Sequence, residues 1–125
     1  NIEELLIYTK NKLIYSPYSN GTISKWTHPT VLRYFGIENN VEFLNKLNRN
    51  GAIMSFYVNN ADVQKLLKDF YEYSKIKDAI CPEGSSRANH RQDQALFTIL
   101  FFQFMNKHGI EVENWYRCIK FHYHY

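Results

Sequence analysis

The sequence predicts a mixed α/β fold, and three observations lead to that class. Residues Gly51–Val58 form a mostly apolar run, which is typical of a strand buried in a sheet. The segment Ala61–Ser74 carries apolar residues at helical spacing, and Ala95–Met105 is apolar on almost every face, which indicates a helix inside the core. Arg117–His124 places successive side chains on alternate faces, so we expect a last strand there, nearer the edge of the sheet.

Before the first predicted strand, the sequence favours short helices separated by turns. Thr27 is expected to cap a helix that carries Pro29 in its first turn and runs to Phe35. Gly36 then ends this helix, because glycine adopts the left-handed conformation of a C-terminal cap without strain. The other elements expected in this region are a helix over Ile2–Leu13, a turn-rich loop over Ser16–Gly21 and a helical turn or two over Val41–Leu47.

Two longer helices are expected after the apolar strand. Asn60 is expected to cap the first of them, and residues 75–88 are interpreted as a loop. Asn89 is expected to cap the second helix, His90–His108, which ends at Gly109. The side chains expected in the core are Val63, Leu66, Leu67, Phe70 and Tyr71 of the first helix, and Leu96, Ile99, Leu100 and Phe101 of the second, packed against the apolar strand.

Five consecutive polar or charged residues, His90 to Gln94, run directly into the apolar helix. In the first turn of a core helix they place an imidazole, a guanidinium, a carboxylate and two carboxamides beside unpaired backbone N–H groups. Such a helix end usually points into a cleft, so this cluster is a candidate site. The same residues also fit a second interpretation, a well-capped helix start whose first turn is solvated.

Charge and hydropathy exclude two classes of partner. The net charge of the 125-residue chain is +3, and its lysines form no basic stripe, so we expect no nucleic acid partner. The apolar run Ala95–Met105 is too short to cross a bilayer and is interrupted by Gln103, so we expect no membrane segment in this chain. Hydrophobic residues make up 45% of the chain, enough for one globular domain.

The two cysteines, Cys81 and Cys118, lie far apart in the sequence. They can pair in an oxidising compartment or remain as two buried free thiols, and both interpretations stay open. Neither belongs to a Cys-x-x-Cys arrangement, which argues against a zinc site. The location of the protein stays open too, between the cytoplasm and the lumen of the Golgi or endoplasmic reticulum.

Three segments together resemble the C-terminal half of nucleotide-sugar-dependent glycosyltransferases with the A-type fold. Two of them, Trp26–Pro29 and His90–Leu96, are similar to motifs of an uncharacterised glycosyltransferase family found in nematodes and large DNA viruses. The third is the passage from Ala52–Asn60 into Leu66–Tyr73, an apolar strand, an asparagine turn and a helix rich in aromatic residues. The resemblance covers roughly residues 22–125.

This resemblance implies a partial A-type glycosyltransferase-like sheet flanked by helices. Residues 1–125 are then a single domain or a fragment, the C-terminal half of a glycosyltransferase-like domain. The family's Asp-x-Asp motif, which holds the metal and the sugar diphosphate, does not occur here. The aspartates are Asp62, Asp69, Asp78 and Asp93. Either the nucleotide-binding half lies upstream in a longer protein, or this chain binds no nucleotide sugar.

The resemblance also implies roles for the polar cluster. Asp93 is the candidate for holding donor-sugar hydroxyl groups, or for the general base of an inverting reaction, with Gln94 hydrogen-bonded to the sugar. His90 and Arg91 are candidates for contacts to the sugar or to the diphosphate. A carboxylate in the first turn of a helix is also stabilised by the helix dipole, so Asp93 fits a purely structural interpretation as well.

Four further residues complete the expected site. Trp26 is a candidate stacking platform for an acceptor sugar, and His28 a candidate contact to it, although both also fit the packed entry to a helix. His122 and His124 share one face of the last strand, and the resemblance implies that one of them binds Mn²⁺ or Mg²⁺. Two histidines on an edge strand that face water are the competing interpretation.

The function that follows is transfer of a sugar from a nucleotide-sugar donor to a glycan or protein acceptor. The expected partners are therefore a nucleotide sugar and a glycan acceptor, and the expected cofactor is a divalent metal. The alternative is a non-catalytic carbohydrate-binding or structural interaction module with the same partial fold. An Asp-x-Asp strand upstream of Asn1 would favour the transferase over the non-catalytic module.

Overall fold

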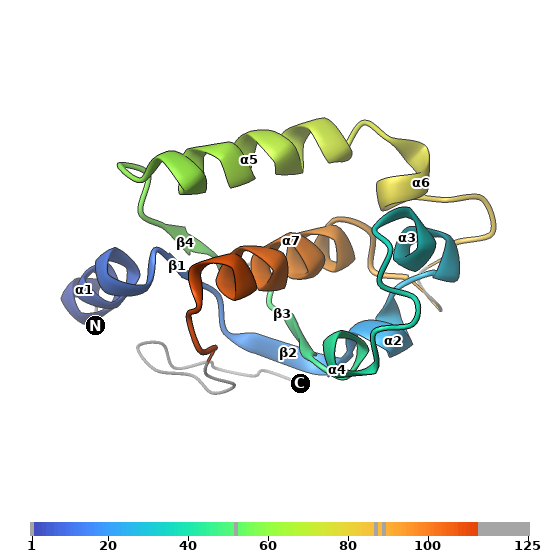
Figure 1. Ribbon diagram of the computed structural model, residues 1–125, viewed down its shortest axis with the longest axis horizontal. Coiled ribbons are helices and arrows are strands. Elements are labelled where there is room, and N and C mark those ends of the chain that lie inside the picture. The colour runs from blue at the N-terminus through green and yellow to red at the C-terminus, as the bar shows by residue number, and fades with distance from the viewer. Residues whose placement is uncertain (1, 52, 87, 89, 113–125) are drawn as a thin grey trace, which may run out of the picture.

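The computed structural model describes residues 2–51, 53–86, 88 and 90–112, and the expected strand Arg117–His124 lies outside this part of the chain. Helices and four short strands alternate along the described chain (Figure 1). No helix in the described ranges is both long and apolar enough to span a membrane. In chain order the elements are α1 (Ile2–Lys12), β1 (Ile14–Tyr15), β2 (Tyr18–Thr22), α2 (Ile23–Trp26), α3 (Pro29–Tyr34), α4 (Val41–Leu44), β3 (Leu47–Arg49), β4 (Ser55–Phe56), α5 (Ala61–Tyr73), α6 (Lys77–Ile80) and α7 (Gln92–His108).

The strands form two short antiparallel pairs, β1 with β4 and β2 with β3. Ile14 lies opposite Phe56 in the first pair. Between the pairs, the backbone N–H of Asn50 donates to the carbonyl oxygen of Pro17 at 2.8 Å, so the two pairs continue one another as an interrupted ribbon. The predicted mixed α/β class is confirmed, while the sheets of the described residues are these two antiparallel pairs.

The prediction of a buried strand over Gly51–Val58 is wrong. Strand geometry is confined to β4, and the rest of the described segment is half-buried or exposed. Ser16, which lies between β1 and β2, explains why the strand is interrupted before β4. Its hydroxyl oxygen lies 3.2 Å from the carbonyl oxygen of Asn50 and 2.9 Å from that of Ile53. A side chain thus bonds backbone groups that a continuous strand would pair with a neighbouring backbone.

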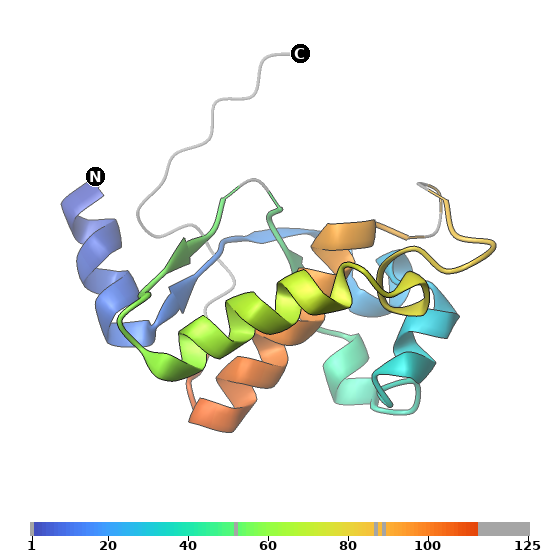
Figure 2. The same cartoon turned by 90° about the horizontal axis from the view of Figure 1, so that it is seen from above.

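Helix α7 is the centre of the molecule, and α5 crosses one side of it (Figure 2). The ring of Phe97 lies 5.7 Å from that of Phe70 on α5 and 6.0 Å from that of Phe56 on β4. Phe97 is fully buried, and burial of a side chain of this size stabilises the fold by about 1.5–3 kcal/mol. The predicted burial of the core residues of this helix is confirmed, at 7% exposure or less, for Leu96, Ile99, Leu100 and Phe101.

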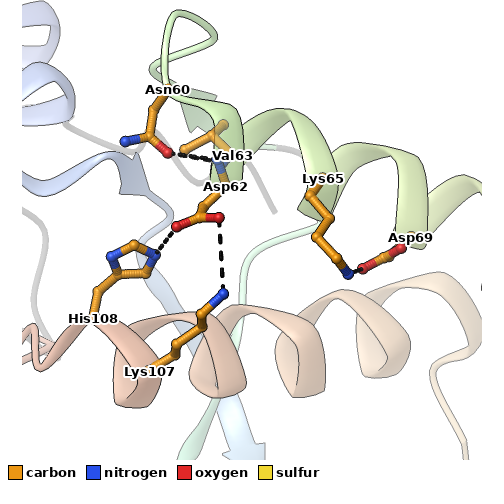
Figure 3. Close-up of polar contacts among 7 residues, drawn as sticks. All are labelled: Asn60, Asp62, Val63, Lys65, Asp69, Lys107 and His108. Atoms are coloured by element: carbon orange, nitrogen blue, oxygen red, sulfur yellow. Dashed lines mark hydrogen bonds and ion pairs between the residues drawn. The ribbon is translucent and has the colours of Figure 1, made fainter.

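The predicted helix ends are confirmed where a capping residue marks them. Oδ1 of Asn60 accepts hydrogen bonds from the backbone N–H groups of Asp62 and Val63, at 2.9 and 3.1 Å, and so caps α5 (Figure 3). Gly36 and Gly109 follow the C-terminal ends of α3 and α7 with φ of 70° and 64°, the left-handed conformation expected of glycine there.

Two predicted N-caps need correction. His28, not Thr27, caps α3, because its ring nitrogen accepts the hydrogen bond that a threonine hydroxyl was expected to accept. Helix α7 begins at Gln92 rather than at His90, and Arg91 occupies its N-cap position without a side-chain cap bond. The predicted cap Asn89 lies outside the described residues. The polar cluster therefore straddles the helix start and does not fill its first turn.

The shortest elements were not predicted. Strand β2 occupies much of the segment interpreted as a loop over Ser16–Gly21, helix α6 lies in the loop predicted at residues 75–88, and β3 begins where a helix was expected to end. Elements of three to five residues are too short to show a hydrophobic period. Tyr71 was also placed in the core and is 60% exposed.

Candidate functional site

Two segments that lie far apart in the sequence meet at the start of α7. The backbone N–H of Arg91 donates to the carbonyl oxygen of Trp26 at 3.0 Å. The backbone N–H of His28 donates to Nδ1 of His90 at 3.1 Å, across 62 positions of the chain. One bond runs in each direction, so the two segments are held in a fixed register. The two segments that carry the strongest sequence motifs therefore form one local structure.

His90 is 1% exposed, and both of its ring nitrogens are bonded within the protein. A backbone N–H can only donate, so Nδ1, which accepts from His28, carries no proton. Nε2 therefore holds the proton and donates it to the carbonyl oxygen of Ile80 at 2.6 Å. Burial lowers the pKa of His90, an effect that the bond to Ile80 opposes and the nearby His28 reinforces. This geometry makes His90 a positioning residue and leaves no ring nitrogen for the sugar or diphosphate contact expected of it.

His28 has a local role as well. Its Nδ1 accepts from the backbone N–H of Thr30 at 3.1 Å, which is the cap contact of α3. The other ring nitrogen faces the loop between α6 and α7, since a Cβ atom on Gly84 would lie 3.6 Å from it. The expected contact to an acceptor sugar is therefore not supported by the position of the ring, which is partly buried between two loops.

The guanidinium of Arg91 stacks on the indole of Trp26, with Cζ 4.2 Å from the ring centroid. Nη1 of the same group donates to the hydroxyl oxygen of Ser19 at 3.4 Å and to the carbonyl oxygen of Asn20 at 3.3 Å. The indole packs against Gly21, where a Cβ atom would come within 2.2 Å of Nε1. The arginine covers one face of the indole, so Trp26 orients Arg91 and that face is not a free platform for a sugar.

An open hollow of about 380 Å³ lies beside this stack, lined by His90, Arg91, Gln92 and Asp93. Its volume is within the range of small-molecule sites. Asp93 is exposed, and its Oδ1 accepts from the backbone N–H of Gln94 at 3.0 Å. Gln92 has φ of 40°, a strained conformation for a non-glycine residue that costs about 1–3 kcal/mol. The strained turn lies between the guanidinium bound to Trp26 and the exposed carboxylate.

Gln94 connects the helix start to the ribbon. Its Nε2 donates to the carbonyl oxygen of Arg49 at 2.7 Å. The backbone N–H of Arg49 donates to Oγ1 of Thr98 at 3.0 Å, and that hydroxyl donates to the carbonyl oxygen of Gln94 at 2.8 Å. This closed network between β3 and α7 engages the amide of Gln94. Nε2 of Gln94 therefore fixes α7 against β3, and the expected contact from Gln94 to a sugar stays a prediction for Oε1.

Arg49, which anchors this network, is a fully buried arginine. Its guanidinium lies over the rings of Phe101 and Phe102, with Cζ 5.6 and 5.1 Å from their centroids. Burial lowers the pKa of Arg49 to about 10, against the opposing effect of Tyr15 and Tyr8. The side chain therefore stays charged at neutral pH, and it holds β3 on the surface of α7.

The expected metal ligands, His122 and His124, lie outside the described residues. Within the described part of the chain, no three histidine, cysteine, aspartate or glutamate side chains lie together as a metal site. Cys81 is exposed, which corrects the interpretation of a buried thiol, and Cys118 lies outside the described ranges. No pairing between the two cysteines can be assigned from the described residues.

A second hollow, of about 200 Å³, lies between α5 and α7. An oxygen of Asp62 lies 3.8 Å from Nζ of Lys107, and the other lies 3.2 Å from Nε2 of His108 without the alignment of a hydrogen bond (Figure 3). Nζ of Lys65 lies 2.7 Å from Asp69, and this hydrogen bond raises the pKa of Lys65. The charges here neutralise one another, so the groove is the weaker candidate. Its floor is nearly buried and consists of Leu66, Leu100 and Phe104.

The sequence interpretation missed the residues that surround the stack of Arg91 on Trp26. Ser19, Asn20 and Gly21 were interpreted as a loop, although the glycine provides the space that the indole occupies. The sequence carries no specific signal for this packing, because a glycine in a turn-rich segment fits many conformations and many neighbours. Gln92 could not be singled out, because its strain depends on the surrounding contacts.

No protein-family model, no curated protein and no solved structure matches this chain. The geometry of the site and the motifs it contains are therefore the basis for inferring a function.

Proposed function

We propose that this chain is part of a nucleotide-sugar-dependent glycosyltransferase and that sugar binds in the hollow at the start of α7. The observation that carries this proposal is the pair of backbone and imidazole bonds that join Trp26–His28 to His90–Arg91. A helix cap needs only its own neighbouring residues, whereas a binding site commonly combines distant segments. Here two distant motif segments meet beside an open hollow.

In this proposal Asp93 is the catalytic residue. Glycosyl transfer passes through an oxocarbenium-like state as the nucleoside diphosphate leaves, so a carboxylate near the sugar is required. Asp93 is exposed at the hollow, free to hold donor hydroxyl groups or to accept the proton of an acceptor hydroxyl. His28, His90 and Gln94 act indirectly, because their bonds fix the backbone on which Asp93 stands.

The proposal also requires a nucleotide-binding half that this chain does not contain. The chain supplies the acceptor-side half of an A-type fold, and the nucleotide-binding half belongs to other residues of the protein. A divalent metal would be held by that half together with His122 or His124, and it would neutralise charge on the leaving diphosphate. Asp62, Asp69 and Asp78 are not expected to take part, since they lie on α5 and α6, away from the hollow.

The test is Asp93→Asn in the protein that contains this chain, assayed for nucleoside diphosphate release with a panel of nucleotide sugars and glycan acceptors. We expect a loss of about 100-fold or more in turnover, with a loss of only about 0.3–1 kcal/mol in unfolding free energy. Asp69→Asn, on the surface of α5, is the matched control and should keep normal turnover. Near-normal turnover of Asp93→Asn, or no turnover of any donor, would contradict the proposal.

The second candidate is a carbohydrate-binding module without transferase activity. It is favoured by one observation, that the polar groups of His28, His90 and Gln94 are engaged in internal bonds. Among the described residues that line the hollow, the carboxylate of Asp93 is then left to contact a bound sugar. Binding of a free sugar to the protein without release of nucleoside diphosphate from any donor would favour this module over the enzyme.

A further inference from the structure

The guanidinium of Arg91 is held in one position more firmly than a surface arginine usually is. Its own backbone N–H is bonded to Trp26, its Cζ lies on the indole of that residue, and its Nη1 is bonded to Ser19 and Asn20. The indole cannot retreat, since it already fills the space beside Gly21. Holding a flexible side chain in this way costs conformational entropy, which the cation–π contact offsets in part.

In the part of the chain that the structure describes, the guanidinium of Arg91 has no acidic partner. Within the described residues, no carboxylate forms an ion pair with Arg91, although Lys65, Lys75 and Lys107 elsewhere each lie within 4.0 Å of one. Asp93, two residues away, bonds the backbone N–H of Gln94 instead. A second positive charge lies on the same side, because Nζ of Lys25 lies 5.4 Å from the same indole ring. The mouth of the hollow is therefore locally cationic on the side of the tryptophan.

We propose that the hollow is an anion subsite, in which the guanidinium of Arg91 binds an oxyanion carried by the ligand. The contacts to Ser19 and Asn20 use Nη1, so Nη2 and Nε remain for two parallel hydrogen bonds to a pair of oxygens. Trp26 is the positioning residue that sets the orientation of this fork. The volume of about 380 Å³ admits a charged group together with an attached sugar ring.

This inference rests on the proposed function in placing a sugar ligand in the hollow, but it requires no transfer. The oxyanion has two possible sources, the phosphate of a nucleotide-linked donor or the carboxylate of an acidic sugar. Inorganic pyrophosphate and sodium glucuronate are therefore the two probes, and glucose is the neutral comparison. Each is titrated into the protein that contains this chain and followed by calorimetry, and by NMR where the binding is weak.

We expect one of the two anions to bind more tightly than glucose, and Arg91→Gln to weaken that binding by about tenfold or more. Arg91→Lys keeps the charge and loses the fork, so it should bind with intermediate affinity. Arg33→Gln on α3, whose guanidinium contacts Thr30, should bind like the unmodified chain. If Arg91→Gln fails to fold, the comparison of Arg91→Lys with Arg33→Gln carries the test.

Equal binding by Arg91→Lys and the unmodified chain would overturn the inference, as would the absence of binding by both anions. The outcomes for the two proposals are separable. Binding of glucose with no preference for either anion removes the anion subsite and leaves the transferase proposal standing. Arginine-dependent binding of an anion, in a protein that releases no nucleoside diphosphate from any donor, supports the subsite and removes the transferase.

Discussion

The imidazole of His90 accepts a hydrogen bond from the backbone N–H of His28, with 3.1 Å between the two nitrogens. The same ring donates to Ile80, so one buried side chain ties the entry of α3, the end of α6 and the start of α7 together. This arrangement requires a neutral ring, because a protonated Nδ1 would face another donor. The relationship makes the site sensitive to acid.

The first prediction concerns this acid sensitivity. The pKa of His90 is lowered in the folded protein from its ordinary value of 6.5, mainly by burial, so the unfolded chain binds the proton more readily. The stability that depends on the neutral ring is complete above about pH 6.5, and is lost as the pH falls below that value toward the folded pKa. Denaturant titrations from about pH 7 to about pH 5 should show the unfolding free energy falling, by at most about 1.4 kcal/mol per pH unit from this group.

The control for this prediction is a pair of variants. His90→Gln cannot titrate and can still accept and donate a hydrogen bond, so its unfolding free energy should depend less on pH. His108→Gln removes a partly exposed histidine at the end of α7 and should keep the dependence due to His90. If His90→Gln and the unmodified protein lose stability in parallel, the histidine is not the group that titrates.

The second prediction separates backbone strain from a steric clash. Gly21 and Gly36 both have positive φ, 86° and 70°, so alanine is strained at either position by about 1–3 kcal/mol. Only at Gly21 would the new Cβ also meet the indole of Trp26, since nothing lies within 4 Å of the corresponding position at Gly36. Gly21→Ala should therefore lower the unfolding free energy more than Gly36→Ala, and should shift the indole resonance of Trp26. Equal effects would mean that the indole is free to move.

The third prediction concerns Gln94. Replacing it with alanine removes the bond to the carbonyl oxygen of Arg49, and an unsatisfied group of this kind costs about 1–3 kcal/mol. Gln103→Ala, at an exposed position of the same helix, is the matched substitution and should stay within about 0.5 kcal/mol of the unmodified protein. The measurement is the thermal stability of the two variants. A Gln94→Ala protein as stable as Gln103→Ala would show that the network between β3 and α7 contributes little.

The fourth prediction tests the core. Leu100 is 7% exposed between α5 and α7, so Leu100→Ala should cost about 2–5 kcal/mol, a large share of the stability of a domain of this size. Lys107→Ala in the last turn removes a mostly exposed ion pair and should change little. A Leu100→Ala variant within about 0.5 kcal/mol of the unmodified protein in urea would contradict the packing described for α7.

Elements with a strong local signal could be predicted from the sequence. Helix α5 has a capping asparagine and apolar residues at helical spacing, and α7 is long and apolar enough to have no place outside the core. The ribbon could not be predicted, because its strands are two to five residues long and are stabilised by contacts such as that of Ser16 with Ile53. Pairing of this kind depends on distant residues, which the local pattern does not report.

In the candidate site, too, local features could be predicted and those that depend on distant contacts could not. The polar residues from His90 to Gln94 could be found as a cluster, because all five stand in a row directly before the apolar run of the helix. Which of them face the hollow could not be read from the sequence, since that depends on partners such as Ile80, Trp26 and Arg49. His90 has both ring nitrogens bonded within the protein, while His28 and Gln94 each use one nitrogen to hold the backbone in place.

The most direct test of the central claim is the location of the ligand. Chemical-shift mapping of the protein with UDP-linked and GDP-linked sugars in the presence of Mg²⁺ reports which residues respond. We expect the largest changes at the backbone amides of Arg91 and Asp93, which line the hollow, and at the indole N–H of Trp26, which stacks on Arg91. Changes confined to the groove of Asp62 and Lys107, or no change with any donor, would contradict the assignment of the site to the start of α7.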